Sequence, residues 1–253
     1  MSNNLMLHAG GRVATLDEVR DCATPSAIGR WHPTPHVKVL ESVKETLAGA
    51  GYIVRAEKYA LARNDQRFFG VLDLATPLVQ DVSLSVGVRN NTDKSFPLGF
   101  AAGSRVFVCD NLAFSAELMV RRKHTLNGMR AFGSAIGQAV ASLASFKDME
   151  ANCIQRLTEL ELSPSAASHF ILTAFRRGII NSHQIADVCK EWEAPRHEDF
   201  RPRTAWSLFN AFTEILRNRA ITSPQTFVAS TIRLNGLMLP PVQEAKAEPV
   251  IAA

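Results

Sequence analysis

Two kinds of hydrophobic periodicity divide the chain near Thr125. Before it, apolar and polar residues alternate in several segments, which is typical of half-buried β-strands; the pattern is clearest over residues 82–89. The short connections between these segments favour antiparallel pairing, so we expect an antiparallel sheet of about five strands between residues 52 and 110. The five predicted strands are residues 52–61, 67–76, 81–91, 95–103 and 105–111.

Helices are predicted on both sides of the strand region. One is expected near residues 36–48, where Thr34 can act as a cap, Pro35 suits the first helical position and apolar residues recur at helical spacing. A long helix should begin near Leu126, since its apolar residues fall on one face. Those residues are Met129, Phe132, Ile136, Val140, Leu143 and Phe146. Later helices are predicted over residues 163–178, 182–193, 201–219 and 223–236, three of them opening with a proline.

The predicted fold is therefore α+β, with a preceding helix, the sheet and a helical C-terminal half. We expect a loosely ordered N-terminal segment over residues 1–30, where sustained periodicity is lacking, and a sheet domain with the long helix over residues 31–150. A helical part should follow over residues 151–239. Residues 240–253, rich in proline, alanine and charge, are expected to form a disordered tail.

Composition points to an ordinary globular chain without a membrane segment. Of the 253 residues, 46% are hydrophobic and 21% charged, which suffices for a sizeable core. No apolar run approaches the roughly 18 to 20 residues that cross a bilayer, and the N-terminus is too polar for a signal peptide. The expectation is a cytoplasmic protein with no membrane partner.

Neither a cofactor nor a metal is expected. The four cysteines are dispersed and form no C-x-x-C pair, which argues against a zinc site or a disulfide framework. His32 and His36 are separated by two prolines, so a rigid loop leading into a helix is favoured over a metal-binding helix. The common phosphate-loop, dinucleotide, metalloprotease and serine-hydrolase motifs are absent as well, which weakens an enzymatic interpretation.

Residues 86–117 carry a family resemblance. Arg89, Asn90, Asp93, Lys94 and Ser95 match an Arg-Asn-Ser-x-Asp-Lys-Ser segment in which Asn91 replaces the usual serine, and residues 106–111 match Val-Phe-Val-Cys-Asp-Asn. These strings resemble the domain-of-unknown-function family 932, often labelled phage/plasmid-like protein. With the helix at 204–219, the likeness extends over about residues 30–236. The resemblance implies the biology of phage or plasmid mobile elements, in or near DNA transactions such as recombination.

The adjacent residues Cys109, Asp110 and Asn111 admit several interpretations. The favoured one is structural: the thiol packs as a small apolar group and a polar side chain caps the following turn. A nucleophilic cysteine would need a base such as His124. A magnesium site would need Asp110 with Asp93 or Asp73. A ligand-binding role for Asn111 and the turn at 89–94 stays open.

The net charge of +4 and the pI of about 9.0 favour a polyanionic partner only weakly, but the placement of the cations is more informative. Arg176 and Arg177 end a predicted helix, where cations favour the helix dipole, whereas residues 121–124 precede one and gain nothing from it. A phosphate partner would account for the second cluster. The predicted nucleic-acid-binding residues are Arg89, Asn90, Lys94, Asn111, Arg121, Arg122 and Lys123.

The favoured hypothesis is a non-enzymatic nucleic-acid-binding protein of a mobile element, with single-stranded DNA the preferred partner and a homo-oligomer as a possible assembly. One alternative is an enzyme, either a metal-dependent phosphodiesterase or nuclease or a cysteine-using modifier. Another is a protein-interaction factor acting against host defence. Sequence alone does not separate these classes.

Overall fold

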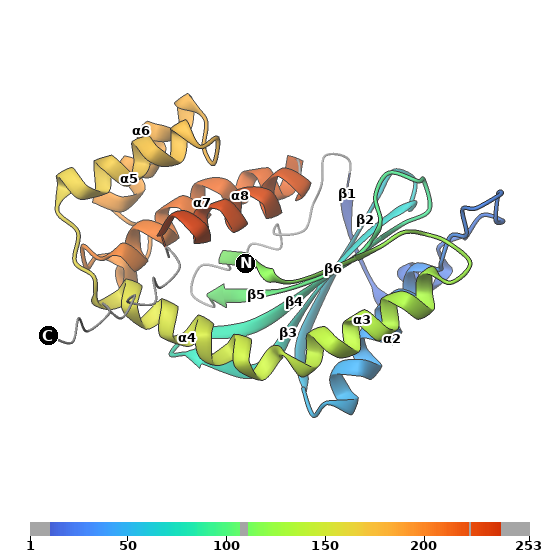
Figure 1. The fold of residues 1–253 in the computed structure, drawn as a ribbon. Helices are drawn as coiled ribbons and strands as arrows, with labels where there is room; N and C mark the ends of the chain where they lie inside the picture. Colours follow the sequence, from blue (N-terminus) through green and yellow to red (C-terminus); the bar gives the residue numbers. More distant parts are fainter. Residues whose placement is uncertain (1–10, 107–110, 223, 239–253) are drawn as a thin grey trace, which may run out of the picture.

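A computed structural model describes residues 11–106, 111–222 and 224–238. Its centre is a six-stranded antiparallel sheet with the strands in sequence order, β1 to β6, and helices cover both faces (Figure 1). This confirms the predicted α+β fold. The strands are β1 (Gly11–Ala14), β2 (Val54–Ala62), β3 (Arg67–Val79), β4 (Val82–Asn91), β5 (Leu98–Val106) and β6 (Asn111–Arg122).

The sheet differs from the prediction in three strands, β1, β5 and β6. β5 unites two predicted strands, because its pairing with β4 runs without a break from Gly99 to Val106, across Gly103 and Ser104. β6 is a strand of 12 residues that the sequence analysis did not predict, since its apolar residues cluster instead of alternating. β1 was also missed, because four residues are too few to show a period.

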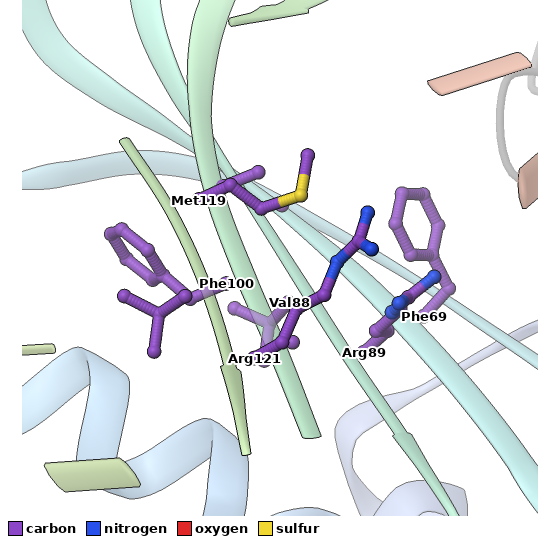
Figure 2. A pocket seen from close by; sticks show the side chains of 10 residues that line it. Phe69, Val88, Arg89, Phe100, Met119 and Arg121 are labelled. Atoms are coloured by element: carbon purple, nitrogen blue, oxygen red, sulfur yellow. The ribbon is translucent and has the colours of Figure 1, made fainter. Parts of the chain in front are cut away.

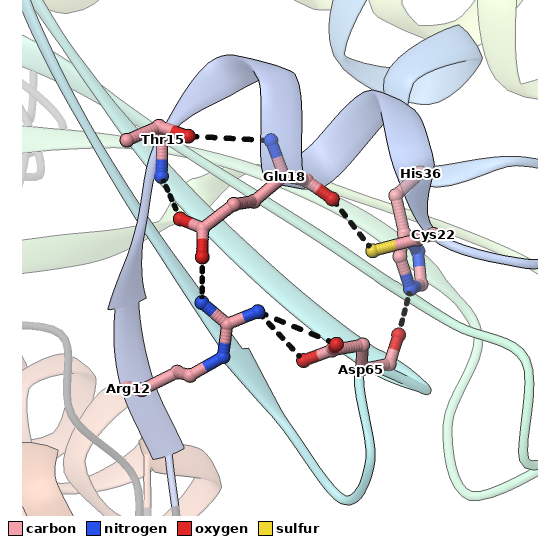
Figure 3. A network of polar contacts seen from close by, with 6 residues as sticks. All are labelled: Arg12, Thr15, Glu18, Cys22, His36 and Asp65. Carbon is pink, nitrogen blue, oxygen red and sulfur yellow. Dashed lines mark hydrogen bonds and ion pairs between the residues drawn. The ribbon is translucent and has the colours of Figure 1, made fainter.

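The N-terminal strand and helix are tied to the body of the protein by the polar network of Figure 3. Thr15 and Glu18 form a capping box that starts α1 (Leu16–Asp21). Arg12 pairs with Glu18 and, at 3.2 Å, with the carboxylate of Asp65 in the β2–β3 turn. The segment 11–21, for which no element was predicted, is thus regular and anchored.

One face of the sheet packs on α2 (His36–Gly49), α3 (Gly128–Ala141) and α4 (Leu143–Glu159) (Figure 1). α2 confirms the helix predicted near 36–48, although Pro35 is its N-cap and not its first residue. The predicted long helix is broken at Ser142, whose backbone N–H is shared between the Gln138 carbonyl at 3.2 Å and the Ala139 carbonyl at 3.1 Å. Its apolar stripe nevertheless continues through both helices into one core.

The C-terminal helices lie on the other face (Figure 1). They are α5 (Pro164–Arg176), α6 (Ser182–Glu193), η1 (Glu198–Phe200), α7 (Ala205–Thr222) and α8 (Pro224–Met238), and the four α-helices match the four later predictions. A second core joins them to the sheet through Ala60, Val71, Phe69 and Ala101. No helix in the described parts of the chain is long and apolar enough to span a membrane.

Three sequence expectations fall outside the described residues. They concern Cys109, Asp110 and the tail at 240–253.

Candidate nucleic-acid interface

The β4–β5 turn is a rigid platform built from the family-like residues. The side-chain amide of Asn91 donates to the Phe96 carbonyl, and its oxygen accepts the Ser95 N–H at 3.1 Å. Asp93 accepts the Ser95 N–H at 3.0 Å and pairs with Arg67 Nε at 2.6 Å. Burial acts to raise the pKa of Asp93, but the hydrogen bonds from Ser95 and Arg67 outweigh it and lower that pKa. The turn therefore holds a fixed shape.

At the apex of this turn Lys94 is exposed and has a left-handed backbone, with φ of +64°. Its ammonium nitrogen lies 4.8 Å from the ring centroid of Trp31, within cation–π range. The contact joins the turn to the loop that precedes α2. Two segments that are more than 60 residues apart in sequence thus meet on one surface.

A cleft of about 860 Å³ opens between these segments and the connection from β6 to α3, and we call it the basic cleft. Its lining carries three cations, two histidines and two large aromatic rings, and none of the described lining residues is acidic. The lining consists of residues 29–32, 94–97 and 123–126. The cations are Arg30, Lys94 and Lys123, and the rings are Trp31 and Phe96.

The wall of the basic cleft is held together by backbone and buried polar groups. The backbone N–H of His32 donates to the His124 carbonyl at 3.1 Å, so the loop before α2 is fixed to the end of β6. His124 is buried with a ring nitrogen 3.4 Å from the Asn91 amide, and burial lowers its pKa despite the opposing effect of the Phe96 carbonyl. A neutral His124 thus leaves the positive charge of the cleft to its three cations.

A second basic site lies on the sheet face that carries Phe69 and Ala101, and we call it the arginine hollow. Arg89 of β4 and Arg121 of β6 both lie opposite Gly99 of β5, so their side chains project from the same face. Figure 2 shows the two guanidinium groups near each other beside Phe69 and Met119. The hollow is small, with a volume of about 40 Å³.

Arg89 is half-buried, and its guanidinium carbon lies 5.1 Å from the ring centroid of Phe96. Burial lowers the pKa of Arg89 to about 10, and the charge of Arg121 contributes to the decrease. Phe96 also lines the basic cleft, so the cleft and the arginine hollow approach each other where its ring meets Arg89. The two sites therefore adjoin at the contact between Phe96 and Arg89.

The structure divides the residues predicted to bind nucleic acid between these sites. Lys94 and Lys123 line the basic cleft, whereas Arg89 and Arg121 line the arginine hollow. Arg122 follows Arg121 on β6 and lies opposite Leu98, so its side chain leaves from the other face. Its guanidinium donates to the Arg121 carbonyl at 2.8 Å.

Of the two predicted amides, Asn90 has a described side chain. Asn90 is fully buried, and its side chain donates to the Thr34 carbonyl at 2.8 Å and to His36 Nδ1 at 2.9 Å. It joins β4 to the start of α2 and lines neither site. Asn111 pairs with Val106 through the backbone at the start of β6, and its side chain lies outside the described parts.

Arg30 and Trp31 were not predicted to bind a ligand: Arg30 ends the segment 1–30 that was expected to be loosely ordered, and Trp31 begins the loop leading into α2. The signal was present as the consecutive residues Arg30, Trp31 and His32, a cation beside two rings. Nothing in the sequence showed that this loop meets the β4–β5 turn.

The residues considered for metal chemistry are otherwise engaged where they are described. Asp93 pairs with Arg67, and Asp73 is buried and accepts the Ser85 hydroxyl at 2.8 Å. Within residues 11–106, 111–222 and 224–238, no group of three or more His, Cys, Asp or Glu side chains could hold a metal ion.

Comparison with known proteins identifies the family. No curated protein matches the chain, and no solved structure does. The family described as Domain of unknown function (DUF932) matches residues 26–238, a range that contains both basic sites. The chain therefore belongs to the DUF932 family, as the residues of the β4–β5 turn had indicated.

Proposed function

We propose that this protein is a non-enzymatic nucleic-acid-binding protein that holds a single strand in the basic cleft. The observation that carries the proposal is the cleft lining, in which three cations and two aromatic rings face the same space without an acidic residue among the described ones. Such a combination serves both parts of a nucleotide, because cations neutralise phosphates and rings stack on bases.

The dimensions and position of the cleft favour a single strand over a duplex. A volume of about 860 Å³ lies within the range of pockets that enclose small organic groups such as a nucleotide. Its rings lie in the lining, where only unstacked bases could reach them, and the bases of a duplex are stacked on one another. We therefore expect weaker binding of duplex DNA.

The cellular role follows from the family resemblance and not from the geometry. Phage/plasmid-like proteins imply mobile-element biology, in which single-stranded DNA arises during replication and recombination. Single-stranded DNA is accordingly the preferred ligand of the proposal, with RNA as the competing ligand to be measured beside it.

The experiment measures fluorescence anisotropy of labelled single-stranded DNA, duplex DNA and RNA of the same sequence at several salt concentrations between about 50 and 200 mM. If Arg30, Lys94 and Lys123 each contact a phosphate, the logarithm of affinity for the single strand should fall with the logarithm of salt at a slope of about −2. The double substitution Lys94→Ala and Lys123→Ala should flatten this slope by about 1.4.

A matched control removes two cations elsewhere. Arg176 and Arg177 are exposed at the end of α5, so their replacement by alanine makes the same change of net charge. The control should retain the wild-type slope. Absence of salt-sensitive binding in the wild-type protein, or equal loss in both double variants, would contradict the proposal.

A further inference from the structure

Arg89 and Arg121 lie side by side without a counter-charge among the described residues. Arg67 pairs with Asp93, and Arg196 pairs with Glu191 and Glu214. Over the described residues, by contrast, neither Arg89 nor Arg121 has a carboxylate partner, and Arg89 meets only the ring of Phe96. A half-buried guanidinium beside a second one is costly, because both burial and repulsion oppose its charge.

The backbone is adapted to this costly arrangement. A Cβ atom at Gly99 would lie 2.7 Å from both Cγ and Nε of Arg89, so the absence of a side chain there lets Arg89 lie across β5. Gly99 of β5 thereby leaves room between Arg89 and Arg121, which lie on the two strands that flank β5. Phe69 and Met119 bound the hollow with apolar surface (Figure 2), which strengthens the attraction of the cations for an anion.

The geometry points to a ligand with about two negative charges confined to one group. We propose that Arg89 and Arg121 bind a phosphomonoester, namely the terminal phosphate of the single strand whose interior occupies the basic cleft. This inference rests on the proposed function for the identity of the strand. An internal phosphodiester carries one negative charge, whereas a terminal monoester carries about 1.5 to 2 at neutral pH and so matches two unneutralised cations.

The chemistry of arginine suits this role. A guanidinium presents paired donors that match the oxygens of a phosphate, and two guanidinium groups can share the three terminal oxygens. The hollow of about 40 Å³ provides room for one such group and not for a base. The ring of Phe96 lines the basic cleft and meets Arg89 of the hollow, so a strand in the cleft that passes this ring would bring its end to the arginines.

The test compares one single-stranded oligonucleotide in three forms, with a 5′-phosphate, with a 3′-phosphate and with neither. One of the phosphorylated ends should raise affinity by about tenfold, the size expected for added hydrogen bonds to charged groups. Arg121→Gln should abolish this difference, and Arg121→Lys should restore only part of it because lysine lacks the paired donors. Equal affinity for all three forms by a protein that still binds the strand would overturn the inference.

Arg122→Gln is the matched control. It removes the same charge from the neighbouring residue of β6, but the side chain leaves from the other face of the sheet. The variant should retain the preference for the phosphorylated end. Loss of that preference in both variants would show a general effect of charge and would also overturn the inference.

A second measurement needs no nucleic acid and separates this inference from the proposed function. Inorganic phosphate and a nucleoside monophosphate should each raise the melting temperature above that in chloride of equal ionic strength, and Arg121→Gln should remove the increase. If phosphate raises the melting temperature through Arg121 but the protein binds no single strand, the proposed function is rejected and the phosphate site remains as a site for small ligands. Equal stabilisation of wild type and Arg121→Gln would instead show unspecific screening and reject the site.

Discussion

Asn90 Nδ2 lies 2.9 Å from His36 Nδ1 and 2.8 Å from the Thr34 carbonyl oxygen, so one buried amide joins strand β4 to the first turn of helix α2. His36 in turn bonds through Nε2 to the Asp65 carbonyl at 3.0 Å. Because the amide donates to Nδ1, this nitrogen must be unprotonated, and the proton of the neutral ring resides on Nε2. The arrangement fixes both the tautomer of His36 and the position of α2 against the sheet.

Replacing Asn90 by alanine should therefore destabilise the fold and not impair ligand binding directly. The change leaves the buried acceptors on Thr34 and His36 without their donor, which costs about 1 to 3 kcal/mol for such a group. Urea denaturation should show an unfolding free energy lower by about 2 kcal/mol. Asn127→Ala, at an N-cap where the side chain makes no capping hydrogen bond, is the control and should change stability little. Wild-type stability of the Asn90 variant would contradict the structural role.

Lowering the pH from about 7 to about 5.5 should destabilise the protein through its buried histidines. Burial lowers the pKa of His36, despite the hydrogen bond to Asp65, and also that of His124. A histidine with a folded pKa below its unfolded value binds protons more readily when unfolded, so its contribution is complete above the unfolded pKa of about 6.5 and is lost as the pH falls below it. The loss should not exceed about 1.4 kcal/mol per pH unit for each histidine.

Melting temperatures measured across that range provide the check. His36→Gln removes one titrating group and should make the decline shallower, whereas His183→Gln, at an exposed position in α6, should reproduce the wild-type decline. A wild-type melting temperature that stays constant or rises as the pH falls would show that the two buried histidines are not the controlling groups.

Gly99→Ala should displace Arg89 and lower the stability of the fold. The added methyl group would lie 2.7 Å from Cγ and Nε of Arg89, so the side chain must turn from its base and take the guanidinium away from Phe96 and Arg121. We expect an unfolding free energy lower by about 1 to 3 kcal/mol and loss of the preference for a phosphorylated strand end. Gly137→Ala, where a Cβ meets nothing within 4 Å, is the control and should keep the preference. A Gly99 variant that retains it would show that the placement of Arg89 does not matter.

Trp31 should report strand binding through its fluorescence. Its ring lines the basic cleft, so stacking of a base should quench its emission, and Trp31→Phe should abolish the quenching. Trp31→Ala should weaken binding by about tenfold, since one stacked base contributes about 1 to 3 kcal/mol. Trp206 stacks on Phe209 within α7 and lies in neither basic site, so Trp206→Phe should retain full quenching. Quenching that persists in Trp31→Phe would show that the ligand binds outside the basic cleft.

The regular elements with a strong period were predictable from the sequence, and those that depend on partners were not. Val86 and Val88 alternate with smaller or polar residues and lie in β4 as predicted, and the Ser163–Pro164 signal begins α5. β6 was missed because its pairing with β5, and not a period in the sequence, decides it. The break at Ser142 was missed because the apolar period of the helix continues across it.

The candidate site was predictable in part. The cations at 121 and 123 were identified because a charge cluster that precedes a helix gains nothing from its dipole, and Lys94 because it stands in the polar turn 89–94. The alternation of a strand then separates Arg121 from Arg122, a division that depends on which residues form β6. Trp31 and Arg30 reach the site through a loop-to-turn contact between segments distant in sequence, and Asn90 turns inward for the same tertiary reason.

The position of Phe96 between the two basic sites has a consequence for ligand length. When one ligand spans two sites, binding at the first site holds the rest of the ligand near the second. The length of ligand between the sites sets its effective concentration there, so the combined affinity exceeds that of either site. An oligonucleotide too short to reach from the basic cleft past Phe96 to Arg121 would obtain only one of the two contributions. Affinity should therefore rise with strand length in a step, and the length at that step would measure the path along the protein surface between Lys94 and Arg121.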